Sequence, residues 1–249
     1  MEKVSYNKDA IIEIVNLKKS FGENKVLNDL SLTVKQGENV VVIGKSGSGK
    51  SVLIKCIIGL IKPDSGTVSV FGNDVSQLSN EDLDKMRAKV GFLFQSNALY
   101  DSMTVRENLE FPLRRHWLND KKHSMKELVL EALTNVGLAD TIDKKPSDLS
   151  GGMKKRIALA RTLILKPEII LYDEPTSGLD PITGKEISNL ILEIQKKYNT
   201  SSIIISHDLS CSKIAANRVV ILIDGACYAT GTYEEVSTMS DKKVKQFFD

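Results

Sequence analysis

The sequence has little of several features that mark other classes of protein. Its 249 residues include three cysteines, three histidines and one tryptophan, and no apolar run approaches the roughly 20 residues that span a bilayer. Cys56, Cys211 and Cys227 lie far apart without CxxC spacing, so we expect buried small hydrophobic residues instead of disulfides or a structural metal site. The N-terminal stretch lacks the apolar core of a secretory signal, and we therefore expect a cytoplasmic protein.

Net charge is nearly absent as well. Lys and Arg number 34 against 32 Asp and Glu, which leaves a formal charge of +2 at pH 7. Without a basic field to attract phosphate backbones, we expect no nucleic-acid partner. The chain also lacks internal repeats, low-complexity tracts and Pro/Gly/Ser-rich linkers, so we expect a single domain over residues 1–249.

What the chain does contain is a series of short β-branched runs. Four of them are apolar on both alternating faces, at residues 40–43, 169–172, 203–205 and 219–223. This pattern is typical of central strands in a parallel sheet that helices cover on both sides. Earlier segments, such as 30–34 and 67–71, alternate more and predict a flanking antiparallel sheet. Between about 96 and 165 the apolar residues recur at helical spacing, so we predict a three-layer α/β fold with a helical insertion.

A glycine-rich loop directly follows the predicted strand at 40–43 and precedes an apolar helical stretch at 52–60. Its spacing fits the P-loop pattern in the expected strand–loop–helix context, which disfavours an ordinary glycine-rich turn. In a P-loop, backbone amides stabilise phosphate charge, Lys50 reaches the β- and γ-phosphates, and the Ser51 hydroxyl ligates Mg²⁺. The predicted ATP-binding residues of this loop are Gly44, Lys45, Ser46, Gly47, Ser48, Gly49, Lys50, Ser51 and Val52.

Two adjacent carboxylates, Asp173 and Glu174, end the predicted strand at 169–172. The carboxyl ends of strands in α/β proteins face the crevice in which ligands bind. We therefore expect Asp173 to hold hydrated Mg²⁺ and Glu174 to polarise a water for attack on the γ-phosphate. A solvated acidic turn before Pro175 is the alternative, and the P-loop elsewhere in the chain weighs against it.

A second anion-seeking helix start lies about a hundred residues beyond the P-loop. Here the run Leu149-Ser150-Gly151-Gly152-Met153 precedes a helical stretch at 154–165. Together with the P-loop, this run resembles the LSGGQ signature of ABC-transporter nucleotide-binding domains, and the resemblance extends over roughly residues 11–235. In that family, Ser150, Gly151 and Gly152 of one subunit would cover the ATP held by the P-loop of a second copy, giving a homodimer with two shared sites.

The resemblance implies a P-loop NTPase (RecA-like) core with an antiparallel β subdomain and an inserted helical subdomain. The core would comprise about 11–95 and 166–240, and the helical subdomain about 96–165. Further residues take family roles by their order in the chain. Gln95 matches the Q-loop residue that contacts Mg²⁺ and the attacking water, and His207 matches the switch histidine at the γ-phosphate. Asp180 matches the D-loop at the dimer interface.

Phe21 matches the aromatic residue that stacks on adenine, which is usually Tyr, although a core Phe beside a turn is the alternative. The predicted catalytic residues are Glu174, His207, Gln95 and Lys50, and the predicted metal ligands are Ser51, Gln95 and Asp173. Met153 replaces the usual signature Gln, and Tyr172 stands where the family normally has an aliphatic residue. Neither departure removes a phosphate-binding atom.

The family resemblance further implies membrane-spanning permease subunits, with this chain peripheral on the cytoplasmic face of the inner (plasma) membrane. An apolar docking patch is expected after Gln95, made of Leu99, Tyr100, Phe111 and Leu113, with packing of the helical part as the alternative role for half of them. The cluster at 114–117 is interpreted as a solvated helix face rather than a lipid-headgroup contact. At the C-terminus, docking back onto the fold and contact with a regulator both remain open for Val244, Phe247 and Phe248.

The stretch after Gln95, LSGGM and DEPTSGLDPITG most resemble the ATPase subunits of MCE-associated, Mla-type phospholipid transporters, which act on outer-membrane lipid asymmetry. This resemblance implies phospholipid transport and an MCE-domain lipid-binding partner. An importer of polar amino acids or another small solute is the alternative. Non-transport ABC ATPases of DNA repair or ribosome rescue are disfavoured, because the chain has neither a long coiled coil between its phosphate motifs nor tandem cassettes.

Overall fold

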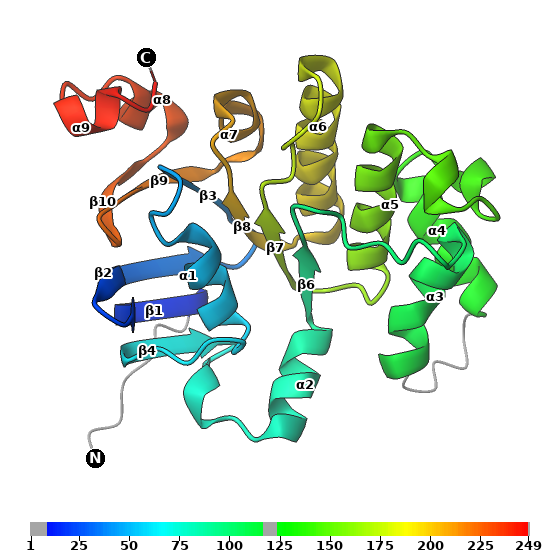
Figure 1. Cartoon of the computed structure of the whole chain (residues 1–249), viewed down its shortest axis with the longest axis horizontal. Coiled ribbons are helices and arrows are strands. Elements are labelled where there is room, and N and C mark those ends of the chain that lie inside the picture. The colour runs from blue at the N-terminus through cyan, green and yellow to red at the C-terminus, as the bar shows by residue number, and fades with distance from the viewer. Residues whose placement is uncertain (1–8, 117–123, 249) are drawn as a thin grey trace.

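The computed structural model describes residues 9–116 and 124–248, whose strands and helices are arranged in layers (Figure 1). The predicted α/β class is confirmed. The strands are β1 Ala10–Phe21, β2 Asn24–Lys35, β3 Asn39–Gly44, β4 Ser65–Val70, β5 Asn73–Asp74, β6 Val90–Leu93, β7 Ile169–Asp173, β8 Ser201–Ile205, β9 Arg218–Ile223 and β10 Ala226–Gly231. The α-helices are α1 Lys50–Ile57, α2 Asn80–Ala88, α3 Val105–His116, α4 Met125–Asn135, α5 Gly151–Leu163, α6 Pro181–Tyr198, α7 Leu209–Ala215, α8 Tyr233–Ser237 and α9 Lys242–Lys245.

The central sheet brings distant parts of the chain to one edge. In the described residues its strand order is β10-β9-β3-β8-β7-β6, with β10 antiparallel to β9 and the other neighbours parallel. Strand β8 lies between β3 and β7, and Ile205 near its end pairs with Val42 of β3 and with Asp173 of β7. Because the carboxyl ends of parallel strands meet at the same edge, the segments that follow β3, β7 and β8 are neighbours.

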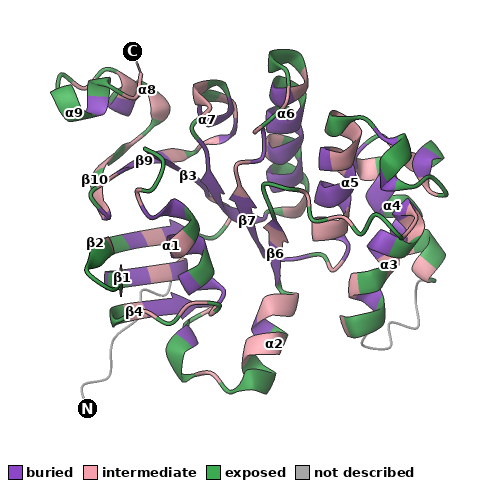
Figure 2. Cartoon of the chain, viewed as in Figure 1, coloured by how far each residue is buried: buried purple, intermediate pink, exposed green. Residues whose placement is uncertain are grey.

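Side chains that alternate along the central strands enter two different apolar cores. Val41 and Ile43 of β3 pack in the core that contains buried residues of α3 to α7, as does Tyr172 of β7. Val40 and Val42 pack in the other core, with α1 and the antiparallel sheet. Both faces of these strands are therefore buried, which is why their sequences are apolar without a polar alternation (Figure 2).

The flanking sheet is antiparallel, as the alternating N-terminal segments predict. Among the described residues its order is β2-β1-β4-β5. Ile12, Ile14 and Leu17 of β1 are buried, and the register shifts between Ile14 and Leu17, where Asn16 has a φ of 50°. This bulge keeps Leu17 on the buried face although it lies an odd number of residues after Ile14.

Three predicted boundaries differ from the structure. The helix after the P-loop ends at Ile57 instead of residue 60, because Gly59 takes a φ of 66° and Leu60 turns toward solvent. The helix after the signature starts at Gly151, three residues earlier than expected, because Ser150 caps it by accepting a hydrogen bond from the Met153 N–H. Strand β6 stops at Leu93, one residue short of the expected end, and Phe94 is exposed.

Cys56 and Cys211 are buried as expected, whereas Cys227 is partly exposed. Within residues 9–116 and 124–248, no helix combines the length and apolar character needed to cross a bilayer. Trp117 lies outside the described residues. Its neighbours Arg114 and Arg115 pair with Glu110 and Asp84, respectively.

Val244 is buried and Phe247 and Phe248 pack against the core, so the C-terminal segment docks back onto the fold.

Candidate active site

The P-loop connects β3 to α1 and forms one wall of a cleft of about 870 Å³. Gly49 precedes the first residue of α1 with a φ of 99°, and a Cβ atom there would lie 2.7 Å from the carbonyl oxygen of Val26. Only glycine fits this position, since both the backbone conformation and the space exclude a side chain. The first turn of α1 therefore presents its free amide groups at the cleft, an arrangement suited to anions.

Lys50 lies in the cleft with its ammonium group held by the loop itself. Its Nζ donates to the carbonyl oxygens of Gly44 at 2.7 Å and Lys45 at 3.0 Å. Burial lowers the pKa of Lys50, and the charges of Glu174 and Asp173 oppose this shift. The cation is thus positioned between the loop and two carboxylates, where a polyphosphate would meet it.

Two oxygen atoms suited to Mg²⁺ lie close together at the start of α1. The Ser51 hydroxyl lies 3.5 Å from Oδ1 of Asp173, at the end of β7. Burial raises the pKa of Asp173, while the hydrogen bond from Ser51 and the charges of Lys55, Lys50 and Lys155 act in the opposite direction. A hydroxyl and a carboxylate this close form a hard oxygen donor set, so these residues fit a magnesium ion that also binds substrate phosphates.

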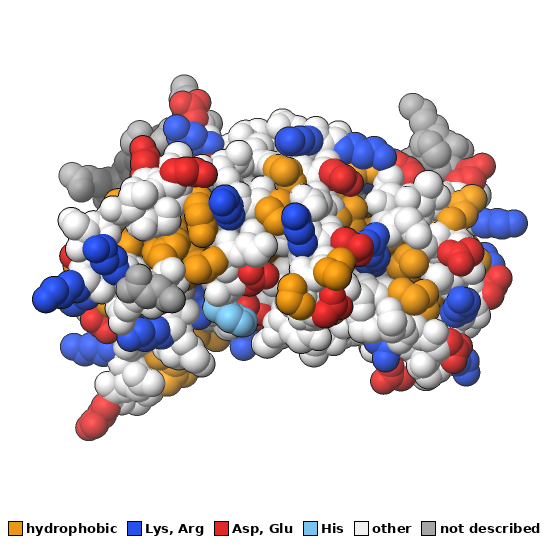
Figure 3. All heavy atoms as spheres, turned by 90° about the horizontal axis from the view of Figure 1, so that it is seen from above, with side chains coloured by type: hydrophobic (Ala, Val, Ile, Leu, Met, Phe, Trp, Pro, Cys, Tyr) orange, Lys and Arg blue, Asp and Glu red, His pale blue; other side chains and the backbone are white. Residues whose placement is uncertain are grey.

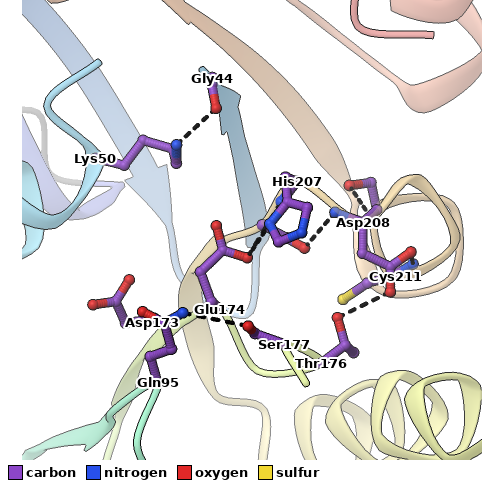
Figure 4. A network of polar contacts seen from close by, with 12 residues as sticks. Gly44, Lys50, Gln95, Asp173, Glu174, Thr176, Ser177, His207, Asp208 and Cys211 are labelled. Atoms are coloured by element: carbon purple, nitrogen blue, oxygen red, sulfur yellow. Dashed lines mark hydrogen bonds and ion pairs between the residues drawn. The ribbon is translucent and has the colours of Figure 1, made fainter. Parts of the chain in front are cut away.

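Glu174 and His207 meet across the carboxyl edge of the sheet (Figure 4). Oε2 of Glu174 lies 2.8 Å from Nδ1 of His207 and also accepts a longer hydrogen bond from the His207 N–H, at 3.4 Å. Glu174 takes a left-handed φ of 51°, and its own N–H donates to the Ile205 carbonyl of β8. A non-glycine residue in this conformation costs free energy and is held by its surroundings, here by β8 and the histidine segment.

Hydrogen bonds extend this cluster to both neighbouring loops (Figure 4). The Gln95 side chain donates from Nε2 to the Ser177 hydroxyl at 3.3 Å, and Thr176 donates to Asp208. Asp208 in turn accepts from the backbone N–H groups of Ser210 and Cys211 at the start of α7. The segments after β6, β7 and β8 are therefore connected through side chains as well as through the sheet.

Most of the nucleotide residues predicted from the sequence line this one cleft: Phe21, Gly44, Lys45, Ser46, Gly47, Gly49, Lys50, Ser51, Val52, Gln95, Asp173, Glu174 and His207. Ser48 borders an adjoining cavity behind the loop. Phe21 is 51% exposed, with Lys19 over its ring, so it is not the core residue of the alternative interpretation.

Ile43, Ile205 and four residues from elsewhere in the fold also line the cleft, and sequence reasoning did not include them among the site residues. Asn24 and Val26 come from the start of β2, and Gln246 and Phe247 follow α9. Gln246 and Phe247 also border the adjoining cavity behind the P-loop. None of the four belongs to a motif with a fixed spacing, and only the fold brings them to the phosphate loop.

The signature residues lie elsewhere. Ser150, Gly151 and Gly152 line a separate hollow together with Asp180, and among the described residues none of these four lines the P-loop cleft. The Asp180 carboxylate caps α6 by accepting from Ile182, Thr183 and the Thr183 hydroxyl, and these hydrogen bonds lower its pKa. A Cβ atom at Gly152 would lie 2.6 Å from the Cγ2 methyl of Thr183, so a side chain there would force Thr183 to move. One chain thus carries a phosphate cleft and a signature hollow apart from each other.

The face seen from above in Figure 3 carries no field of one sign. Lysine and arginine side chains alternate with acidic ones, and a histidine lies beside acidic and apolar side chains. This mixture accords with the small net charge of the chain.

The family model of the ABC transporter matches residues 27–177, which include the P-loop, the signature and the two carboxylates. The chain belongs to the ABC transporter family. The resemblance read from the signature is thereby confirmed. The chain is similar in structure to the ATP-binding cassette MJ0796, in a dimeric post-hydrolysis state bound to ADP and Pi, with a TM-score of 0.80 and 32% identity, covering 89% of this chain and 98% of that one. The fold is that of an ABC ATPase cassette.

Named relatives of this ABC transporter chain differ in their cargo. It is 38% identical over 238 residues to the probable ribonucleotide transport ATP-binding protein mkl of Mycobacterium tuberculosis, covering 96% of this chain and 66% of that relative. The chain thus spans about two thirds of the length of the mycobacterial protein. It is 37% identical to the intermembrane phospholipid transport system ATP-binding protein MlaF of Haemophilus influenzae, covering 95% and 89%. It is 40% identical to the methionine import ATP-binding protein MetN of Clostridium acetobutylicum, covering 95% and 73%.

Proposed function

We propose that this chain is an ATP-hydrolysing motor subunit that dimerises on ATP and drives the permease subunits of a transporter. The observation that carries the proposal is the separation of the P-loop cleft from the signature hollow in one chain. Each lies at the N-terminus of a helix, where backbone amides are suited to phosphate, and two antiparallel copies would bring the hollow of one over the cleft of the other. The likeness to a dimeric cassette bound to ADP and Pi supports this arrangement.

Within the cleft, different residues of this chain would bind the metal ion, bind the phosphates and activate the water. Ser51, Asp173 and Gln95 would hold Mg²⁺, which would neutralise charge on the phosphates. Lys50 leaves its loop carbonyls to bind the β- and γ-phosphates. Glu174 orients and polarises the attacking water, and His207, already 2.8 Å from Glu174, lies where it can contact the γ-phosphate.

The adenine ring would stack on Phe21, whose exposed face opens into the cleft. From the second copy, Ser150, Gly151 and Gly152 would contribute the opposite wall, and the D-loop with Asp180 would lie at the interface. We assign about 96–165 to a helical subdomain, and about 11–95 and 166–240 to the core with its β subdomain, because α3, α4 and α5 lie together on one side of the sheet (Figure 1).

The docking surface for the permease is proposed at Tyr100 and Phe111. Their rings lie 5.0 Å apart, and both side chains are more than 40% exposed, whereas Leu113 is buried and Leu99 packs against the core. Buried Asn108 fixes the loop by accepting from the Tyr100 N–H at 2.8 Å and donating to its carbonyl oxygen. A pair of exposed aromatic rings on a fixed loop is suited to anchoring a partner helix. We place the chain at the cytoplasmic face of the inner (plasma) membrane, as a peripheral subunit bound to the permease.

For the cargo, we propose phospholipid, with an MCE-domain lipid-binding protein among the partners. The likeness to MlaF, which covers 89% of that relative, supports this assignment together with the sequence after Gln95. Methionine or another small solute is the competing cargo, favoured by the 40% identity to MetN. Purification of the tagged chain with its membrane partners decides between them: an MCE-domain protein supports lipid, and an amino-acid permease or binding protein overturns it.

The motor itself is tested by Glu174→Gln. The amide keeps the size of the side chain but cannot polarise water, so ATP binding should persist while turnover is lost. Sizing chromatography in saturating ATP and Mg²⁺ should give a stable dimer for Glu174→Gln and a transient one for the wild type. A variant that stays monomeric, or that hydrolyses ATP at the wild-type rate, contradicts the proposal.

A further inference from the structure

Lys155 is a buried cation on the helix that begins at the signature. It lies in the second turn of α5 with a relative exposure of 2%, and Lys50 is the other lysine or arginine that is buried among the described residues. The Lys155 ammonium donates to the backbone carbonyl oxygen of Gln95 at 2.9 Å. Burial of an ammonium group carries a desolvation cost, which its hydrogen bond to the Gln95 carbonyl offsets in part.

The surroundings of Lys155 have opposing effects on the charged form of its ammonium group. Burial lowers the pKa of Lys155, and the nearby Asp173 carboxylate opposes this effect. No ion pair to a carboxylate within 4.0 Å is found for Lys155 in residues 9–116 and 124–248, so the Gln95 carbonyl is the hydrogen-bond acceptor on which the ammonium rests. The cation therefore fixes one atom of the backbone at the Q-loop glutamine.

The backbone beyond Gln95 is held from the same helix. Arg161 donates to the carbonyl oxygens of Ala98 at 2.7 Å and Asn97 at 2.9 Å. Asn97 and Ala98 have successive left-handed φ values of 64° and 52°, a conformation that is uncommon for residues other than glycine. Side chains of α5 thus hold the backbone of the turn that follows Gln95. The Gln95 side chain itself donates a hydrogen bond to Ser177 of the neighbouring loop.

We propose that Lys155 is a positioning residue for hydrolysis: from the signature helix it holds the Gln95 backbone so that the Gln95 amide faces the chain's own nucleotide. This inference rests on the proposed ATPase function, and it specifies which of the two ATP sites of the dimer each part of α5 affects. The N-terminus of α5 serves the ATP of the second copy, whereas Lys155 on the same helix acts on the ATP bound by its own chain. Replacing Lys155 should therefore harm the site in cis and spare the site in trans.

The first experiment measures ATP turnover and thermal stability of single variants. Lys155→Met removes the charge and keeps the length of the side chain, and kcat should fall about tenfold with KM for ATP nearly unchanged, since Gln95 acts on the reacting centre. Lys155→Arg, which can still donate to the carbonyl, should restore most of the rate. Lys154→Met is the matched control, because no side-chain hydrogen bond or ion pair of Lys154 occurs in the described structure. If Lys155→Met does not fold, Lys155→Gln takes its place.

The deciding experiment uses mixed dimers purified through two different tags, with wild type paired with Lys50→Ala as the reference. In the cis arm, Lys155→Met pairs with Lys50→Ala, so the working P-loop shares a chain with the altered lysine. In the trans arm, one chain carries both changes and the working P-loop lies in a wild-type partner. We expect about a tenfold loss relative to the reference in the cis arm and less than about twofold in the trans arm.

Equal losses in both arms would assign Lys155 to the general support of α5, and no loss in the cis arm would remove it from the reaction; either result overturns the inference. A separate control tests the function on which it rests. Adding Ser150→Arg to the Lys50→Ala chain of the reference dimer should abolish the remaining turnover. If turnover persists there, the shared-site proposal is wrong, whatever the two lysine arms give.

Discussion

Thr176 Oγ1 donates a hydrogen bond to Asp208 Oδ2 over 2.9 Å, and it joins the loop after Glu174 to the segment that carries His207. Thr176 is 6% exposed, so water competes little for this bond. The other carboxylate oxygen of Asp208 caps α7. Asp208 therefore fixes the start of a helix and the path of the D-loop at once, directly beside the proposed catalytic pair.

Thr176→Val should loosen this connection without changing the size of the side chain. We expect kcat for ATP to fall about tenfold, because Glu174 and His207 lose their common support, and stability to fall by about 1–2 kcal/mol, because one oxygen of a partly buried carboxylate loses its donor. Thr176→Ser keeps the hydroxyl and should retain most of the rate. Steady-state kinetics with thermal unfolding checks both, and a wild-type kcat for Thr176→Val would show that the bond does not support the catalytic pair.

Ser150→Arg and Lys50→Ala should each inactivate a homodimer yet complement each other. In the mixed dimer, the intact P-loop of the Ser150→Arg chain meets the intact signature of the Lys50→Ala chain, which leaves one complete site. We expect about a quarter of the wild-type ATP turnover after equimolar mixing, because random pairing makes about half of the dimers mixed and each mixed dimer has one complete site of two. A mixture as inactive as its parents would argue against sites shared between copies.

Phe21→Ala should weaken nucleotide binding and leave the chemistry intact. Loss of the stacking surface removes about 1–1.5 kcal/mol, so KM for ATP should rise about tenfold while kcat changes little. Phe21→Tyr supplies the matched control, since it retains the ring. An unchanged KM for Phe21→Ala would place the adenine elsewhere.

Glu38→Gln should reduce stability in a pH-dependent way. Burial alone would raise the pKa of Glu38, but hydrogen bonds from Arg218 and from the Lys35 N–H, together with the charge of Arg218, lower it below its usual value. A carboxyl whose folded pKa is lowered contributes stability above its unfolded pKa and loses it as the pH falls through the folded pKa. Urea unfolding should therefore show Glu38→Gln less stable by about 1–2 kcal/mol at pH 7, with the difference vanishing at acidic pH. A constant difference across the acidic range would exclude this linkage.

The parts of the P-loop cleft that local sequence patterns predict share one property: each lies at or directly after the end of a central strand. Gly44 to Ser51 follow β3, and Asp173 and Glu174 end β7, so the parallel-sheet rule alone places them at the same edge. The two cores are predictable for the same reason, since apolar residues on both faces of a strand require cover on both sides.

The rest could not be predicted because it depends on contacts between residues that no motif connects. Lys155 looks like one of several charges in the signature helix, and only the packing of α5 against β6 turns it inward toward Gln95. Helix α1 ends at Ile57 because Gly59 has a positive φ, and helix α5 starts at Gly151 because Ser150 caps it. At such boundaries these local features outweigh the periodicity of apolar residues. The family roles of Gln95, His207, Asp180 and Phe21 were taken from the resemblance, and they stay proposals until the variants are measured.

The position of the C-terminal segment beside the P-loop affects where a label can be attached. Gln246 and Phe247 border the nucleotide cleft, so a tag or reporter inserted at these residues would begin beside the proposed phosphate site and beside the face that a second copy would cover. Turnover measured with such a fusion would mix the properties of the motor with those of the label. The same position has a use: a fluorophore attached through Gln246→Cys would sit at the mouth of the cleft and change its emission as ATP binds and as the dimer closes.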